Sequence, residues 1–213
     1  MSNTYTAAPE PAITLHGTLY SGHSHRVELL LRMLDIPYRF VEAAAPQRKG
    51  AEFRTLNPLG QIPVLQDGEL VLCDSNAIMV YLVKRYAPDS CWLPDDPVTA
   101  AQIQRWFSIA AGEIKYGPCT ARMALQWGMP GDPVSAAGIA HDLLRFMDGY
   151  PQGKEYLAAG HATLADLACY PYIAHAPEGR IPLDAYPQVR AWLARVEALP
   201  GFKPMPALPV PAA

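Results

Sequence analysis

Every segment with the apolar pattern of a β-strand lies in the first 74 residues of this 213-residue chain. Residues 13–18 alternate apolar and polar side chains, and residues 38–43 form a second strand-like run. Between them, from Arg26 to Leu34, apolar residues recur at the i, i+3, i+4 and i+7 spacing of one helix face. Strand, helix and strand within about thirty residues predict a βαβ unit with parallel strands.

A β-hairpin is predicted next. Two apolar runs, residues 62–66 and 69–74, are separated by Asp67 and Gly68, a pair that favours a tight turn in which both residues take positive φ. A helical pattern follows up to Tyr86, with Asp74 or Ser75 available as its N-cap.

The remainder of the chain has only helical patterns. Prolines and aspartates cluster in residues 88–97 and indicate a linker. The helical stretches beyond it run from Val98 to about Ile114 with a break at Gly117-Pro118, from Pro133 to Met147, from Thr163, and from Tyr186 to Leu199. Thr163 and Asp166 form a Thr-x-x-Asp variant of the capping box.

The fold class is therefore α/β followed by all-α. We expect a small βαβ-ββα domain over residues 12–87, a linker over 88–97 and an all-helical domain over 98–200. The proline-bearing ends, residues 1–11 and 201–213, are expected to be flexible tails.

Composition excludes several classes of function. Seventeen basic and twenty acidic side chains give a net charge of −3, which does not indicate a nucleic-acid or anionic-membrane surface. The four cysteines form no CxxC pair and no cluster with histidine, so we expect neither a metal site nor a redox pair. With no apolar stretch of spanning length and no secretory signal pattern, we expect a soluble, cytoplasmic protein with reduced thiols.

The order of elements, taken with one motif, resembles the cytosolic glutathione transferases, which join a thioredoxin-like domain to an all-helical domain. The motif is Asn57-Pro58-Leu59-Gly60-Gln61-Ile62-Pro63-Val64-Leu65, and it is similar to the "NPxGxVPxL" segment of that family. Asp74-Ser75 matches the acidic-residue and serine pair of the family, and the Thr163–Asp166 box is like its buried helix start. The resemblance covers about Ile13 to Leu199.

The resemblance implies a binding site for reduced glutathione as co-substrate. Pro63 would be cis, and Ile62 would pair with the cysteinyl backbone of the tripeptide as an added strand does. Ser75 and Asp74, at a helix N-terminus, would hold the γ-glutamyl end. Gln61 is placed for a further hydrogen bond to the ligand, and it could equally be solvated.

The loop after the first strand carries the candidates for thiol activation. It contains no cysteine, which argues against members that form a mixed disulfide with glutathione. Ser21 lies where serine- and threonine-type, bacterial-like members place their hydroxyl, and Tyr20 matches the tyrosine classes if the loop is counted differently. His23 and Ser24 are further alternatives, with Ser24 the expected cap of the first helix. We expect Arg26 to be a surface or domain-interface cation.

The resemblance further implies a pocket for a second substrate, a small hydrophobic electrophile, lined by Trp106, Tyr116 and Arg122. An ordinary amphipathic core accounts for Trp106 equally well. The implied function is conjugation of glutathione to that electrophile by a homodimeric, cytoplasmic enzyme active in detoxification. The alternatives are glutathione-dependent reduction of peroxides or disulfides without a catalytic cysteine, and a non-catalytic interaction module.

Overall fold

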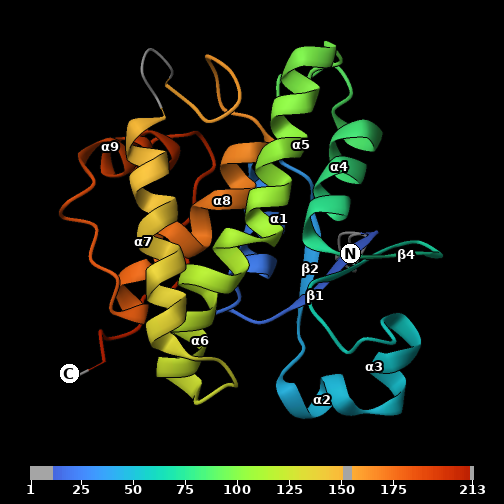
Figure 1. The fold of residues 1–213 in the computed structure, drawn as a ribbon. Coiled ribbons are helices and arrows are strands. Elements are labelled where there is room, and N and C mark those ends of the chain that lie inside the picture. Colours follow the sequence, from blue (N-terminus) through green and yellow to red (C-terminus); the bar gives the residue numbers. More distant parts are fainter. Residues whose placement is uncertain (1–11, 151–154, 212–213) are drawn as a thin grey trace, which may run out of the picture.

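The computed structural model describes residues 12–150 and 155–211. Its first half contains a four-stranded sheet with strand order β2-β1-β3-β4 (Figure 1). The strands are β1 (Ile13–Gly17), β2 (Tyr38–Glu42), β3 (Val64–Asp67) and β4 (Leu70–Cys73). β1 and β2 pair in parallel, whereas β3 is antiparallel to both β1 and β4. The predicted βαβ unit and hairpin are confirmed.

The hairpin turn differs by one residue from the sequence prediction. Asp67 pairs with Leu70 inside the ladder, so the two-residue loop consists of Gly68 and Glu69. Gly68 has a φ of 58°, whereas Asp67 and Glu69 do not have positive φ. A turn with positive φ only at its first central residue needs glycine at that position alone, which explains the shift.

The helices of the first half lie on both faces of the sheet. They are α1 (Gly22–Met33), α2 (Ala45–Lys49), α3 (Ala51–Leu56) and α4 (Ser75–Tyr86). α1 and α4 contact each other and the helical half. Successive residues of a strand point to opposite faces of the sheet. Leu15 and Leu65 therefore belong to the main core on one face, whereas Val64 packs with Phe53 of α3 on the other.

The first helix begins at Gly22, four residues earlier than its apolar pattern predicts. Ser21 is the N-cap, and its Oγ accepts a hydrogen bond from the Ser24 backbone N–H at 3.2 Å. The prediction of Ser24 as the cap is therefore wrong: Ser24 is buried inside the helix. A Cβ at Gly22 would lie 2.9 Å from the Tyr172 ring, so this first turn packs closely against the helical half.

The second half is built from helices, and no strand occurs in its described residues. They are α5 (Pro97–Ala111), the π-helical turn η1 (Lys115–Cys119), α6 (Thr120–Trp127), α7 (Pro133–Gly149), α8 (Leu164–Ala174), the 3₁₀ turn η2 (Ala176–Gly179) and α9 (Pro187–Glu197). The predicted break is present, because Gly117 has non-helical dihedral angles and Pro118 follows it.

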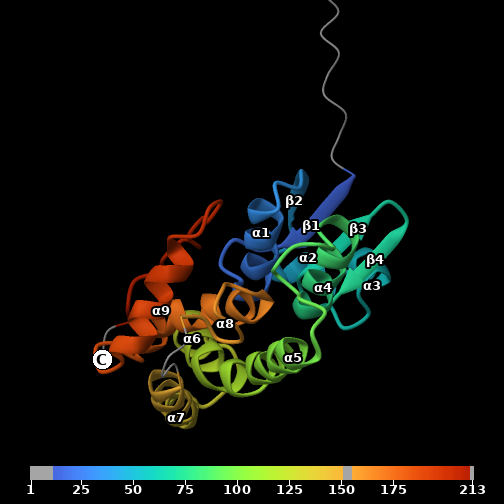
Figure 2. The same ribbon diagram turned by 90° about the horizontal axis from the view of Figure 1, so that it is seen from above.

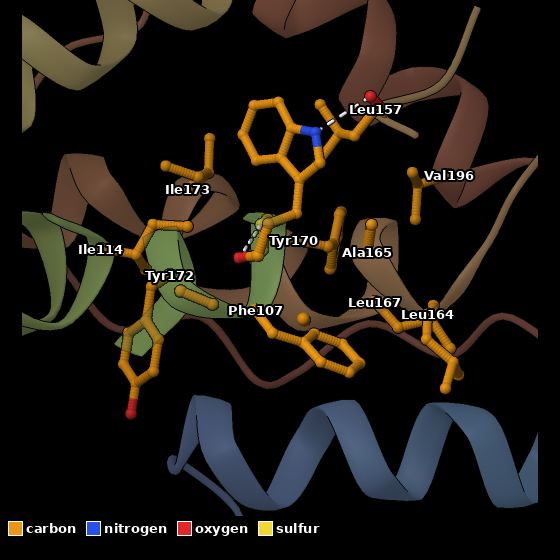
Figure 3. Close-up of a cluster of buried hydrophobic side chains, with 14 of the residues drawn as sticks. Phe107, Ile114, Leu157, Leu164, Ala165, Leu167, Tyr170, Tyr172, Ile173 and Val196 are labelled. Carbon is orange, nitrogen blue, oxygen red and sulfur yellow. Dashed lines mark hydrogen bonds between the residues drawn. The ribbon is translucent and has the colours of Figure 1, made fainter. Parts of the chain in front are cut away.

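α8 is the central helix of the molecule. Every residue from Leu164 to Ile173 is buried, and the helix contacts α1 and α4 of the first half and α5 and α9 of the second (Figure 2). Figure 3 shows part of this shared core, in which Tyr172 reaches from α8 toward the first helix. The two halves therefore pack through one continuous apolar core.

The expectation that the C-terminal residues form a flexible tail is wrong for the part that the structure describes. Residues 201–211 lie against the protein instead of forming a flexible tail: Met205 is buried, and the Lys203 carbonyl accepts a hydrogen bond from His25 Nε2 at 2.8 Å. The Pro209 carbonyl likewise accepts one from Gln126 at 2.9 Å. Proline lacks an N–H but keeps its carbonyl, so a proline-rich segment can still be fixed by side-chain donors. Residues 1–11 and 212–213, also expected to be flexible, lie outside the described residues.

Candidate active site

One end of the sheet brings together three segments that the sequence singled out. β1 ends at Gly17, next to the start of β3, because His16 pairs with Val64. Val64 also pairs with Cys73, the last residue of β4. The loop 18–21 after β1, Ile62-Pro63 before β3 and Asp74-Ser75 after β4 therefore meet at the same edge, together with the N-termini of α1 and α4.

The segment before β3 presents backbone groups. The Ile62-Pro63 bond is cis, as predicted. The pairing of β3 with its neighbours begins at Val64, so the Ile62 N–H and C=O lie outside the ladder. Asn57 supports this turn, since its Nδ2 donates to the Gln61 carbonyl at 2.9 Å. The Gln61 side chain itself is exposed.

The N-terminus of α4 carries the acidic residue and the serine. Asp74 is the N-cap, with a φ of 72°, and its Oδ1 accepts hydrogen bonds from the Asn76 and Ala77 amides at 2.9 and 3.0 Å. Ser75 is the first helical residue and is buried. A helix N-terminus attracts anions because its free N–H groups and the helix dipole are positive there.

A buried arginine joins the two helix N-termini. Arg26 of α1 is 1% exposed, and its NH1 donates to Ser75 Oγ at 3.3 Å and to Asn76 Oδ1 at 3.1 Å. The expectation of a surface cation is therefore wrong, whereas that of a domain-interface cation agrees with the neighbours of Arg26, because Tyr172 and Cys169 of α8 interact electrostatically with its guanidinium. Burial lowers the pKa of Arg26, yet a guanidinium remains charged in proteins. Sequence reasoning missed this contact because its partners are 49 and 50 residues away along the chain.

The candidates for thiol activation occupy different environments. Ser21 uses an oxygen lone pair to cap α1, which leaves its hydroxyl hydrogen available for donation. The Tyr20 side chain is 41% exposed, and its ring centroid lies 6.4 Å from that of Trp127.

His23 lies in the first turn of α1 and not in the loop before it, with its ring 5.0 Å from that of Tyr172. Burial, followed by the charges of Arg26 and Lys115, holds the pKa of His23 well below its usual range. His23 is therefore neutral near pH 7, and it supplies no positive charge to a thiolate.

The three predicted pocket residues differ in exposure and in their partners. Trp106 is fully buried, and its Nε1 donates to the Leu157 carbonyl at 2.9 Å, so it is a core residue and its assignment to a substrate pocket is wrong. Arg122 is also fully buried and pairs with Glu178 at 2.6 Å. Tyr116 is 63% exposed on η1. Apolar periodicity cannot distinguish a core-facing aromatic residue from one that lines a pocket.

No group of three or more potential metal ligands occurs in residues 12–150 and 155–211. Within the same residues, none of the helices combines the length and the apolar character that crossing a membrane requires.

The sheet topology, the cis-proline before β3 and the attached helical half together define a thioredoxin-like domain joined to an all-helical domain. Two family models match the chain: the glutathione S-transferase N-terminal domain over residues 15–90 and the C-terminal domain over residues 134–200. The chain belongs to the glutathione S-transferase family.

Individual proteins agree with this assignment. Glutathione S-transferase 3 of Zea mays is 30% identical over 212 residues, which cover 93% of this chain and 96% of the maize protein. A possible glutathione S-transferase from Rhodopseudomonas palustris has a structure with a TM-score of 0.83 and 30% identity, covering 93% of this chain and all of that one. A glutathione transferase homologue from Drosophila mojavensis, solved with bound glutathione, gives a TM-score of 0.80 and 26% identity over 88% of each chain.

Proposed function

We propose that this glutathione transferase conjugates the thiolate of reduced glutathione to a small hydrophobic electrophile, with the tripeptide bound at the sheet edge formed by Ile62, Asp74 and Ser75. The observation that carries the proposal is the meeting, at that edge, of a backbone segment outside the β-ladder and two helix N-termini. An extended peptide can pair with the Ile62 N–H and C=O as an added strand would, and Gln61 lies next to it.

The N-terminus of α4 is the proposed site for the γ-glutamyl end. Its carboxylate would accept a hydrogen bond from the Ser75 hydroxyl, whose oxygen already accepts one from Arg26. The buried guanidinium adds positive charge to that of the helix dipole. Asp74 Oδ1 is occupied by the cap, whereas no hydrogen bond to its Oδ2 occurs among the described residues, which leaves this oxygen for the ligand ammonium group.

Ser21 is the proposed donor to the glutathione sulfur. A thiol with a pKa near 8.5 is only a few per cent ionised at neutral pH, and the thiolate is the nucleophile. A hydrogen bond from Ser21, at the positive N-terminus of α1, stabilises the thiolate and lowers the pKa of the bound thiol. The hydroxyl donates a proton in a hydrogen bond and does not attack, so no covalent enzyme intermediate forms.

Exposed aromatic side chains favour an apolar second substrate. Tyr20, Tyr116 and Trp127 are 41%, 63% and 43% exposed, and they come from the loop before α1, from η1 and from α6. Tyr20 adjoins the proposed thiol donor, and Trp127 lies beside Tyr20. Turnover of aromatic electrophiles, peroxides and disulfides, measured side by side with glutathione, tests the reaction class; the highest kcat/KM with peroxides or disulfides would contradict conjugation.

The surroundings of Cys73 argue against a reductase that would use this cysteine as its nucleophile. Cys73 lies at the end of β4, beside the proposed site, and its Sγ contacts the Leu56 carbonyl at 3.5 Å. Burial, followed by the charge of Asp74, raises the pKa of the Cys73 thiol. A thiol of this kind stays protonated and is a poor nucleophile toward a disulfide or peroxide.

We expect Ser75→Ala to weaken glutathione binding about ten- to a hundredfold, because one charge-assisted hydrogen bond contributes roughly 1.5–3 kcal/mol. Isothermal titration calorimetry with reduced glutathione measures the affinity. Ser108→Ala is the matched control, since the Ser108 hydroxyl is exposed on α5 and, among the described residues, its one hydrogen bond is to the Gln104 carbonyl of its own helix. Asp74→Ala is expected to lose both binding and the α4 cap, so its stability must be measured as well. Unchanged affinity in both site variants would exclude this binding mode.

We also propose that the enzyme is a homodimer, as its family resemblance implies. β4 is an edge strand with exposed Leu70 and Val71, and Tyr86 of α4 bonds to Asp67 of the same hairpin. We expect sedimentation velocity at micromolar concentration to give about twice the chain mass of 23.3 kDa. A species of the single-chain mass would contradict the proposal.

A cytoplasmic location fits this enzyme, because the cytosol maintains glutathione in its reduced form.

A further inference from the structure

The loop that carries Ser21 is held by the helical half of the protein. Arg122 of α6 donates from NH1 to the Tyr20 carbonyl at 2.8 Å. Tyr20 directly precedes the N-cap, and its carbonyl lies outside the helical pattern, in which the first acceptor is the Ser21 carbonyl bonded by His25 at 2.8 Å. The backbone next to Ser21 is therefore fixed by a residue 102 positions away along the chain.

Arg122 is itself held rigidly. Its side chain is fully buried, and its Nε donates to Glu178 Oε2 at 2.6 Å. The other oxygen of Glu178 accepts hydrogen bonds from His175 Nδ1 at 2.6 Å and from the Leu208 amide at 2.9 Å. Although burial alone would raise the pKa of Glu178, donation from Leu208, His175 and Arg122 lowers it, so the carboxylate stays charged.

The Tyr20 side chain rests on the same helix. The Arg122 guanidinium lies 5.0 Å from the centre of the Trp127 ring, and that ring is the aromatic neighbour of Tyr20. Both the carbonyl and the ring of Tyr20 are thus placed by α6. A buried ion pair contributes little net stability, because desolvation offsets the attraction. The main consequence of the Arg122–Glu178 pair is therefore geometric: it fixes where the loop lies.

We infer that Arg122 is a positioning residue for thiol activation, which holds the Tyr20-Ser21 backbone so that the Ser21 hydroxyl points at the glutathione sulfur. The inference rests on the proposed role of Ser21 and extends it, because it assigns control of that hydroxyl to the helical domain. Lysine cannot reproduce the action, since it lacks the planar fork that reaches Glu178 and Tyr20 at once.

The test uses Arg122→Lys and Arg122→Met in the full chain. Ultraviolet titration of bound glutathione gives the pKa of its thiol, and steady-state kinetics give kcat and KM. We expect the bound thiol pKa to rise and kcat to fall about tenfold in the lysine variant and further in the methionine variant, the effect of misplacing one charge-assisted hydrogen bond. The KM for glutathione should stay unchanged, because Ile62, Asp74 and Ser75 belong to the other half.

Arg145→Lys is the matched control, since Arg145 pairs with Asp142 on the exposed surface of α7. It should leave the thiol pKa and kcat unchanged. A purely structural role for Arg122 would lower the amount of folded enzyme without shifting the pKa of the bound thiol. If the methionine variant does not fold, Glu178→Gln tests the same link, because it loosens the hold on Arg122, and it should raise the thiol pKa in the same direction.

A double-mutant cycle with Ser21→Ala separates this inference from the proposed function. If Arg122 acts through Ser21, Arg122→Lys should change neither the thiol pKa nor kcat further once the hydroxyl is absent. An effective Ser21→Ala with an inert Arg122→Lys would overturn the positioning role alone. An inert Ser21→Ala would overturn the proposed thiol donor, whatever Arg122 does.

Discussion

Removing the Ser21 hydroxyl is expected to slow conjugation about ten- to a hundredfold at pH 6.5 while glutathione still binds, because one charge-assisted hydrogen bond to the thiolate is lost. The bound thiol should titrate at higher pH, which ultraviolet absorbance of the thiolate measures directly. At alkaline pH, where the thiol ionises without help, the difference in rate between variant and wild type should shrink.

The choice of variant matters because Ser21 also caps α1. Ser21→Ala removes the cap and the donor together, and the cap alone stabilises by about 1 kcal/mol. Ser21→Gly is the better-matched variant, because glycine at an N-cap costs only a few tenths of a kcal/mol. Both should lose the same activity. If they keep full rate at pH 6.5 whereas Tyr20→Phe loses it, the donor is Tyr20.

Asp166→Ala is expected to destabilise the helical half by about 4 kcal/mol or more. Asp166 is fully buried, and its two oxygens accept four hydrogen bonds: from the Leu157 amide, from Trp192 Nε1, and from the Thr163 amide and hydroxyl. Alanine would leave these buried donors without an acceptor, at about 1–3 kcal/mol each. Denaturant unfolding followed by circular dichroism measures the loss.

Asp142→Ala is the control for this variant, because Asp142 is an exposed aspartate paired with Arg145. Exposed pairs of this kind contribute less than about 1 kcal/mol. Asp166→Asn keeps one carbonyl oxygen and should fall between the control and the alanine variant. A loss below about 1 kcal/mol in Asp166→Ala would show that the four hydrogen bonds do not anchor α8.

Several parts of the fold could be predicted because their causes are local. The alternation in β1, the tight turn before β4 and the Thr163–Asp166 capping box each depend on residues within a few positions of one another. The place of the candidate site was implied by the family resemblance of the motif that contains Ile62 and of Asp74-Ser75. The order of the strands is not a local property, because β1 pairs with β3 from a distant part of the chain.

Other features depended on partners that local patterns do not contain. The first turn of α1 is helical because Ser21 caps it and Gly22 lies against Tyr172 of α8, whereas its own apolar pattern starts only near Arg26. The segment 201–211 has the composition of a flexible tail, yet its carbonyls accept hydrogen bonds from Gln126 and His25.

For the site, the sequence by itself determined which residues stand at the sheet edge, and the tertiary structure decided what each of them contacts. Ile62, Asp74 and Ser75 follow from a motif and a strand end, which are properties of short segments. The burial of Arg26 and Arg122 follows from the packing of α1 and α6 against the rest of the protein, and burial is a property of the assembled core. From the sequence alone, a charged side chain is expected to be exposed, because burying it without partners is costly. Only the three-dimensional fold supplies the partners of Arg26 and Arg122.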